Sequence, residues 1–517
     1  MNDLFETVDY LMQHGEDELA RLNRPRRDTW FSSLRLEVIF RRAASADNGA
    51  ARRSTVTQSA GLGMSVLARS GAALGFGYSG LELGSEARSA HKLLAALRAG
   101  YARAYERARY NARQAAALAR SRPGPTPGWV ATPSQRSNLP ARFARDPTGL
   151  AQSELEALCR QVSGEIGGLG REVVFNSVSA MTELRRELLI TSEGSVLAQG
   201  FAFAQGDCYV VAQSAQGHDE SHDSIGQQLG PEVLFEGGGE PPMVTPSLRQ
   251  FALDLAGEAR MLAAAPALRP SEEEAVVVTD PHFNALVAHE IVGHPSEADR
   301  ALKMEAGYAG RSWFLRSLSD NQIGCQIGSA LLSACSDPSL PGYGHYAYDH
   351  EGVAGQRVTH IDRGIYVDFL NSRATAAILG VAPNGSARAS AAPYAPLIRM
   401  SNTFILPGQR TPEEIIGEVN HGYYVCGSRT PSIAESRENF RISARRVYAI
   451  EHGRLGQLYR AGSLAADAKR FFSQIDAAGN DLHLFAIPNC GKGQPMQIKR
   501  MSNGGPTLRS RGYLLGV

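Results

Sequence analysis

The segment His289-Glu290-Ile291-Val292-Gly293-His294 constrains this chain most, because its two imidazoles can act together only on a deformed helix. Two histidines and a glutamate this close are the parts of a zinc peptidase that activates water. In the common His-Glu-x-x-His motif, the histidines at i and i+4 lie about 40° apart around the helix and face one metal. Here they lie at i and i+5, about 140° apart on a regular helix. Either the motif is accidental, or the helix deforms between its histidines.

The residues around this segment favour a helix that begins firmly and ends early. Ala275–Thr279 is a short run of apolar residues typical of a buried strand. Asp280 then offers an N-cap and Pro281 occupies the first helical position. Gly293 and Pro295, on either side of the second histidine, are residues that end or unwind a helix. We therefore expect a strand, then the motif helix, then a distortion at its end.

On spacing alone, a two-histidine metal site and a helix end with two unrelated surface histidines are equally good interpretations. In the metal site, His289 and His294 would be ligands and Glu290 would be the general base that takes a proton from water. Catalytic zinc usually has three protein ligands, so one His, Asp, Glu or Cys remains to be identified. Glu297 and Asp299 follow closely and fit either supporting groups around the ligands or a solvated helix terminus.

Two regions of different pattern divide the chain. Residues 25–265 alternate glycine-punctuated β-segments with amphipathic helices, expected at 85–122, 150–166 and 246–264, and this predicts an α+β domain. Within it, residues 122–149 are rich in Pro, Gly and Ser, which indicates a linker-like excursion. Residues 275–517 carry short β-patterns and few long helices, with short helices expected at 413–419 and 464–473. This predicts a β-rich domain built around the motif helix.

The amino-acid composition excludes few classes of protein, but it gives no support to nucleic-acid or membrane binding. Lys+Arg number 53 and Asp+Glu 52, so the formal net charge is +1 and offers no attraction to a polyanion. The sequence has no apolar run of about 18 residues that could span a bilayer. Residues 1–19 are polar and acidic, unlike a signal peptide. The six cysteines form no CxxC pair and are expected to be reduced thiols of a cytoplasmic protein.

Several motifs in order resemble those of the TldD/PmbA family of metallopeptidases, specifically its catalytic TldD-like branch. Residues 289–300 (HEIVGHPSEADR) resemble that branch's His-Glu-x-x-x-His segment. Residues 349–357 resemble the family's D-x-E-G-V…QR stretch, and residues 399–403 resemble its R-M-[ST]-N-[TS] signature. Residues 490–495 resemble the C-terminal C-G-K…G-Q-x-[VP] segment. The match covers most of residues 30–517, which is far more specific than one hexapeptide.

The resemblance implies that Cys490 is the third ligand of a Zn²⁺ ion, although by residue type alone it would be a buried thiol. It implies an α+β fold, with an N-terminal α/β domain and a C-terminal domain dominated by a strongly curved β-sheet. It also implies a zinc-dependent peptidase that cleaves unfolded or flexible peptides, including precursors of ribosomally made peptide natural products. Family members assemble as homodimers or as heterodimers with a homologous subunit.

Some roles stay open at this level. Extended peptides offer their backbone to a sheet edge, so β-strand addition is the expected recognition mode. Arg399 and Asn402 fit contact with substrate, support of the metal site, or a structural role at a β-turn. His345, His350 and His360 cluster loosely and are expected to be surface or core histidines.

Two other functions compete with the peptidase. A non-catalytic peptide-binding subunit of the same fold would have no need to keep the glutamate and all three metal-binding residues. A regulator of a DNA enzyme is poorly supported by the balanced charge and the lack of a DNA-binding motif.

Overall fold

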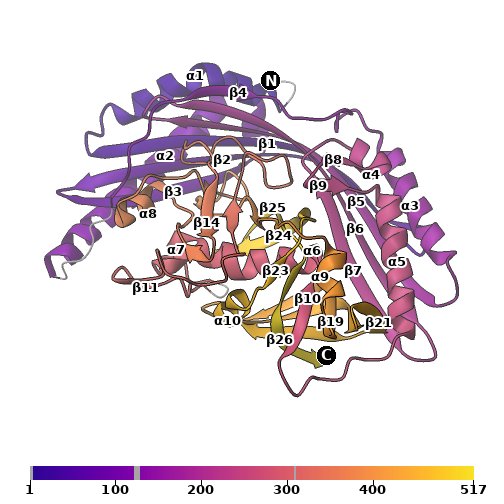
Figure 1. Cartoon of the computed structure of the whole chain (residues 1–517). Coiled ribbons are helices and arrows are strands. Elements are labelled where there is room, and N and C mark those ends of the chain that lie inside the picture. The colour runs from indigo at the N-terminus through magenta and orange to yellow at the C-terminus, as the bar shows by residue number, and fades with distance from the viewer. Residues whose placement is uncertain (1–3, 122–127, 308–309, 517) are drawn as a thin grey trace.

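A long, arched β-sheet covers the C-terminal half of the chain in the computed structural model, which describes residues 4–121, 128–307 and 310–516 (Figure 1). The strand order of this sheet is β3-β2-β1-β5-β6-β4, with β7 also paired to β6. Its strands are β1 (Thr29–Asp47), β2 (Ala50–Ser70), β3 (Ala73–Leu83), β4 (Arg136–Leu139), β5 (Val173–Thr191), β6 (Val196–Gln213) and β7 (His218–Gln227).

Five helices of the described residues pack against this sheet. They are α1 (Glu6–Asn23), α2 (Ala90–Ser121), α3 (Gln152–Gly167), α4 (Glu232–Glu236) and α5 (Leu248–Ala264). Helices α2, α3 and α5 lie where the sequence predicts helices, whereas α1 and α4 were not predicted. On α2, Leu93, Leu97 and Tyr101 repeat at the helical period and are fully buried. The helix lies so close to β3 that a Cβ on Gly77 would come within 2.0 Å of the Ala104 carbonyl oxygen. The glycines of this strand therefore set the distance between helix and sheet.

The segment predicted to be a linker, 122–149, contributes to the sheet. Residues 122–127 lie outside the described residues. Arg136–Leu139 forms β4, which pairs in parallel with β6 from Arg136↔Val196 to Leu139↔Gln199. Proline and glycine content indicates irregular chain but does not reveal a four-residue edge strand, because the pairing partner lies about sixty residues away.

Two further sheets build the C-terminal half. One has the order β10-β19-β20-β22-β26-β23 with β21 on β20, and the other has the order β15-β14-β13-β18-β25-β24. The strands of the first are β10 (Ala275–Thr279), β19 (His421–Ile433), β20 (Asn439–Glu451), β21 (Arg454–Tyr459), β22 (Gly462–Asp467), β23 (Ala477–Ala478) and β26 (Leu508–Gly516). Those of the second are β13 (Ala334–Ser336), β14 (Val358–Asp362), β15 (Ile365–Tyr366), β18 (Asn402–Ile405), β24 (His483–Lys492) and β25 (Gln497–Gly505).

Short elements complete the chain. They are η1 (Ser85–Arg88), β8 (Gly238–Glu240), β9 (Met243–Thr245), α7 (Ala298–Ala301), β11 (Leu315–Ser317), β12 (Asp320–Asn321), α8 (Arg373–Leu379), β16 (Ala387–Arg388), β17 (Leu397–Ile398), α9 (Pro412–Gly417) and α10 (Ala468–Ser473). The helix predicted over 464–473 starts only at Ala468, because Leu464 and its neighbours pair with both β20 and β26. The predicted α+β fold with a β-rich C-terminal half is confirmed.

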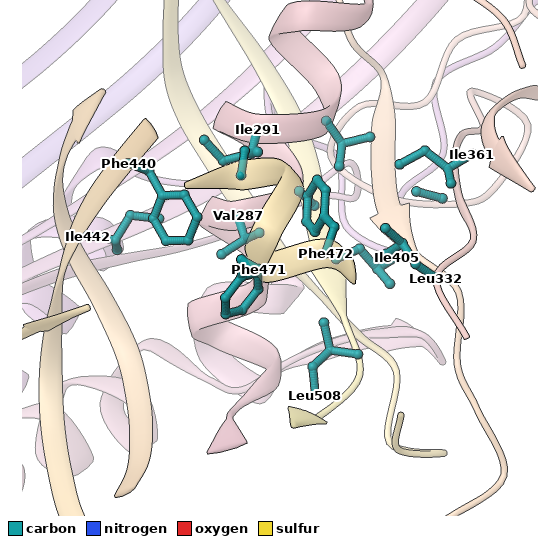
Figure 2. Close-up of a cluster of buried hydrophobic side chains, with 14 of the residues drawn as sticks. Val287, Ile291, Leu332, Ile361, Ile405, Phe440, Ile442, Phe471, Phe472 and Leu508 are labelled. Atoms are coloured by element: carbon teal, nitrogen blue, oxygen red, sulfur yellow. The ribbon is translucent and has the colours of Figure 1, made fainter. Parts of the chain in front are cut away.

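The helix that carries the motif is the centre of the largest hydrophobic core. It is α6 (Pro281–Val287), continued by the turns η2 (Ala288–Gly293) and η3 (His294–Ser296). Val287 and Ile291 are fully buried in this core. Figure 2 shows them among side chains from both sheets and from α10, namely Phe440, Ile442, Ile361, Ile405, Phe471 and Phe472. Packing on both sides holds the motif rigidly. Within the described residues, no helix is long and apolar enough to cross a membrane.

Candidate metal centre

The start of the motif helix is fixed by its cap. The Asp280 carboxylate accepts hydrogen bonds from the Phe283 N–H at 2.7 Å and from the Gly427 N–H at 2.9 Å. Pro281 stands in the first turn, where its missing N–H leaves no bond unmade. The predicted strand, cap and helix start are confirmed. Since β10 pairs with β19 and β26, this cap also fixes the helix relative to the sheet.

A π-helical turn resolves the unusual spacing of the two histidines. From Ala288 to Gly293 the helix widens, and the His294 N–H donates to the His289 carbonyl, five residues back. In such a turn, residues i and i+5 lie above one another. The two imidazole rings therefore meet on one side of the helix, with centroids 4.7 Å apart and planes at 88°. The deformation expected between the histidines is confirmed, and π-turns are frequent at functional sites.

Gly293 serves this turn differently from the expected unwinding. Its φ of −67° is ordinary for any residue, so backbone freedom is not the reason for a glycine here. A Cβ at this position would lie 1.9 Å from the Met400 sulfur. The turn is thus pressed against Met400, and any larger residue at this position would force the Met400 side chain to move. Pro295 stands in the 3₁₀ turn that follows, where a proline is well tolerated.

The structure brings the three expected metal ligands together. One ligand atom from each of His289, His294 and Cys490 lies within 4.8 Å of the other two, and all three residues are buried. The Cys490 Sγ is 3.5 Å from the His294 Nε2, although 196 residues separate the two in sequence. Ligand atoms of one tetrahedral zinc lie about 3.3–3.8 Å apart, given zinc–ligand bonds of about 2.0–2.3 Å. Two imidazoles and a thiol at this spacing fit Zn²⁺.

The protonation states of this cluster also suit a metal. Burial alone would raise the pKa of Cys490, but His289 and His294 hold it well below its usual range, so the thiolate prevails. Burial would lower the pKa of His289, but the Cys490 thiolate raises it to about 9. The thiolate is the form that binds metal. A metal ion entering the site would displace the proton of His289.

Each histidine is oriented by a buried acceptor on its second nitrogen. The Asn503 Oδ1 lies 2.8 Å from the His289 Nδ1, and the Glu297 Oε2 lies 3.0 Å from the His294 Nδ1. These contacts favour the tautomers with Nδ1 protonated, which leave both Nε2 atoms free to bind a metal. Metal-binding histidines almost always have such partners. Asn503 was not predicted, because nothing in its local sequence relates it to a site more than two hundred residues away.

Glu297 is the stronger of these two supports. It is fully buried, which excludes the solvated helix terminus considered above. Its Oε2 also accepts from the Arg300 Nε at 2.8 Å and lies 3.2 Å from the Lys492 Nζ. Burial would raise the pKa of Glu297, but Lys492 and His294 hold it well below its usual range. Lys492 also contacts Asp299 at 2.7 Å, so both acidic residues behind the motif are part of the buried network.

Glu290 is more exposed than the second histidine of the motif: 15% of the Glu290 side chain is accessible, against 5% of the His294 side chain. Its carboxylate forms an ion pair with Arg437, whose Nη1 also donates to the Glu290 carbonyl at 3.2 Å. Burial would raise the pKa of Glu290, but His289 and Arg437 lower it to about 2. Glu290 is therefore ionised at neutral pH and able to accept a proton.

Arg437 was not predicted as a site residue. It lies in the turn between β19 and β20, with a φ of 66°, a conformation in which non-glycine residues are uncommon. Only 4% of its side chain is exposed. Its position depends on a hairpin folding back over the motif, which no local pattern in the sequence reveals.

Arg399 and Asn402 both hold backbone carbonyl groups in place. The buried Arg399 donates to the Cys490 carbonyl at 2.5 Å and to the Gln497 carbonyl at 2.9 Å, so it clamps β24 and β25 beside the third ligand. The Asn402 side-chain amide donates to the Asp337 and Leu340 carbonyls at 3.0 and 2.9 Å. Arg399 thus supports the metal centre through the backbone of Cys490.

The loosely clustered histidines do not belong to the group of metal-binding side chains found among the described residues. His350 and His360 are buried, and His345 is half-buried. His360 bonds to the Ser336 hydroxyl at 2.8 Å, and His350 lies 3.0 Å from Glu187.

Asn503→Ala should weaken metal binding about 10- to 100-fold, because His289 loses the partner that fixes its tautomer. Competition with a zinc chelator of known affinity would measure this. Asn503→Asp, which keeps the acceptor oxygen, should bind metal at least as tightly as the wild type. Asn402→Ala, at a buried amide without contact to a ligand, is the matched control. Unchanged affinity in Asn503→Ala would show that the contact does not support the ligand.

Comparison with known proteins identifies a family model for the C-terminal half and relatives that match larger or smaller parts of the chain. Residues 272–514 match the family model described as the PmbA/TldA metallopeptidase C-terminal domain. A protein named metalloprotease from Methanothermobacter thermautotrophicus is 28% identical over 377 residues, which cover 72% of this chain and 76% of that protein. A zinc metalloprotease TldD homolog from Saccharolobus solfataricus is 29% identical over 252 residues, covering 48% and 52%. The solved structure of TldE from Thermococcus kodakarensis shares the fold, with a TM-score of 0.68 at 15% identity, covering 96% of this chain and 100% of that one.

Proposed function

Because the chain belongs to the PmbA/TldD family of metallopeptidases, we propose that it is a zinc-dependent peptidase that hydrolyses unfolded or flexible peptides. The observation that carries this proposal is the buried cluster of His289, His294 and Cys490 with the ionised Glu290 beside it. A non-catalytic binding subunit would have no use for a thiolate, two oriented imidazoles and a general base in one place.

The proposed chemistry divides between the metal and this chain's own residues. Zinc bound by His289, His294 and Cys490 would polarise the scissile carbonyl and lower the pKa of water. Glu290 takes the proton of the attacking water and delivers it to the leaving amine. Asn503 and Glu297 keep the imidazoles in the required orientation. The surrounding apolar core excludes other water from the ligands and strengthens these charge interactions.

The position of the third ligand supports the proposed substrate class. Cys490 is on β24, the terminal strand of its sheet, and a peptide pairing with a terminal strand adopts an extended form. Such pairing depends on backbone hydrogen bonds and needs an unfolded segment. Precursors of ribosomally made peptides meet this requirement, and their maturation is the role that we propose. We further propose that the enzyme works as a homodimer or with a homologous subunit, which native mass spectrometry of the purified chain would test.

Metal removal tests the activity itself. Dialysis against a chelator should abolish cleavage of a reduced and alkylated protein substrate, and added Zn²⁺ should restore it, because the metal supplies several kcal/mol of transition-state stabilisation. The same substrate in its folded form is the matched control and should be cleaved far more slowly. Full cleavage by metal-free protein, verified by atomic emission, would contradict the proposal.

A further inference from the structure

A cavity of about 320 Å³ lies between the arched sheet and the C-terminal half. Phe201 and Phe203 of β6 and Tyr343 form an apolar wall. The charged part of its lining is mainly basic, with one carboxylate, Glu187, and five cationic side chains, Arg41, Arg185, Arg388, Lys499 and Arg500. A cavity of this size holds one or two residues of a peptide.

This cavity is next to the metal centre. Lys499 on β25 is the direct cross-strand partner of Cys490 on β24. Pro488, two positions before Cys490, also lines the cavity. Arg388 donates to the Met400 carbonyl, and Met400 packs against Gly293 in the motif itself. An extended peptide advances about 3.3 Å per residue, so one that passes the metal ligands reaches the cavity within a few residues.

Three of the five cations already have an anionic partner. Arg41, Arg185 and Arg500 surround the fully buried Glu183, at 2.6, 2.9 and 3.0 Å. Arg185 is also within 3.2 Å of Glu37 and 3.4 Å of Glu187. Glu183 is therefore engaged by three arginines, while Glu187, which lines the cavity, is shared between Arg185 and His350, the latter at 3.0 Å.

Arg388 and Lys499 have no anionic partner within 4.0 Å among the residues that the structure describes. The Lys499 Nζ donates to the Ala389 carbonyl at 2.9 Å, and Arg388 donates to the Met400 carbonyl. Arg388 is only 4% exposed, lies over the Tyr346 ring, and its Nε has no hydrogen-bond partner. Burial, reinforced by Arg388 and opposed by Glu187, lowers the pKa of Lys499 to about 7. Burying unmatched cations is costly, so this wall is suited to an incoming anion.

We propose that the cavity is a specificity subsite in which Arg388 and Lys499 bind a carboxylate of the peptide substrate. The carboxylate belongs to an acidic side chain or to the peptide's C-terminus, and the aromatic wall takes the aliphatic part of the same residue. Charge-assisted hydrogen bonds to a carboxylate are among the strongest in proteins. This proposal rests on the proposed peptidase function, since it supplies that reaction with a substrate preference.

Binding to the Glu290→Gln variant tests the subsite without cleavage. Four fluorescent peptides of one sequence should be compared by anisotropy at about 0.15 M salt, where long-range attraction is screened. They carry Glu or Gln at one internal position and a free or amidated C-terminus. The carboxylate-bearing form should bind at least about tenfold more tightly than its neutral counterpart. If the tighter binding is lost when Glu is replaced by Gln, the bound carboxylate belongs to the side chain. If it is lost when the C-terminus is amidated, the bound carboxylate is the C-terminus.

Substitutions in the Glu290→Gln background locate the effect. Lys499→Gln and Arg388→Gln should each remove most of the preference while the neutral peptide keeps its affinity, which also reports correct folding. Lys499→Arg should restore the preference. Arg454→Gln, at an exposed cation on β21, is the control and should leave it unchanged. Equal binding of acidic and neutral peptides, or a preference that survives both substitutions, would overturn the subsite. A different result would contradict the peptidase proposal alone: wild-type protein that prefers the acidic peptides but cleaves none of them.

Discussion

Glu290→Gln should abolish cleavage of an unfolded polypeptide while the protein keeps its full metal content. Glutamine has nearly the same shape as glutamate but cannot take a proton from water. General bases contribute about 10²- to 10⁴-fold to rate, so the expected loss is of that order. The metal should stay because neither histidine depends on Glu290, since Asn503 and Glu297 orient their rings. Initial rates and zinc content by atomic emission measure the two effects on one preparation.

A control separates this effect from a general loss of carboxylate charge. Glu413→Gln, at an exposed position on α9, should keep the wild-type rate. Cleavage by Glu290→Gln at the wild-type rate would eliminate Glu290 as the base. A drop in zinc content would instead indicate that Glu290 supports the metal. The two outcomes are distinct because the pairing of Glu290 with Arg437 lies outside the three-ligand cluster.

The motif illustrates what local sequence can and cannot predict. The Asp280 cap and the helix start follow from residues within three positions of one another, and both were predictable. The distortion between the histidines was also predictable, because their spacing requires one. Its form as a π-turn was not, since the turn is held against Met400, more than a hundred residues away. The local sequence marks Gly293 as a residue that can end a helix, whereas in the fold its small size makes room for Met400.

The remaining parts of the site come from distant segments of the chain. Cys490 and Asn503 stand on β24 and β25, and Arg437 stands on a separate hairpin. Cys490 was identified through the resemblance of its C-G-K segment, because a lone cysteine has no local pattern that distinguishes ligand from buried thiol. Asn503 and Arg437 lack even that signal. Residues that support or flank a ligand from another sheet become recognisable only when strand order is known.

Strand order also explains why the centre is so well supported. Arg399 ties the Cys490 carbonyl to that of Gln497, while Lys492 ties the same strand to Glu297 behind the second histidine. Two strands and the motif helix are therefore joined by buried charged groups on both sides of Cys490. Removing one partner of such a network leaves a buried charge without compensation, which costs about 3–5 kcal/mol. The metal site and the core of this half thus form one structural unit.

Cys490→Ala should lower the zinc content more than any change in the supporting residues. Loss of a partner such as Asn503 weakens a metal about 10- to 100-fold, so loss of a ligand should weaken it by more than about 100-fold. Among the described residues, Cys490 is the one cysteine in the group with the two imidazoles, so no second thiol stands ready to replace it. After dialysis against a buffer of defined free zinc, atomic emission should find the variant nearly metal-free and the wild type loaded.

Cys335→Ala is the matched control because this thiol is equally buried but has the opposite chemistry. Burial raises the pKa of Cys335 to about 12, so the protonated thiol packs as a small apolar group. Its loss should cost some stability and leave the zinc content unchanged. Cys335 and Cys490 are both buried, so the comparison tests the one difference between them. Two imidazoles stabilise the thiolate of Cys490. Normal zinc content in Cys490→Ala would mean that the third ligand lies elsewhere. The proposal that a peptide pairs with β24 beside the metal would then lose its support.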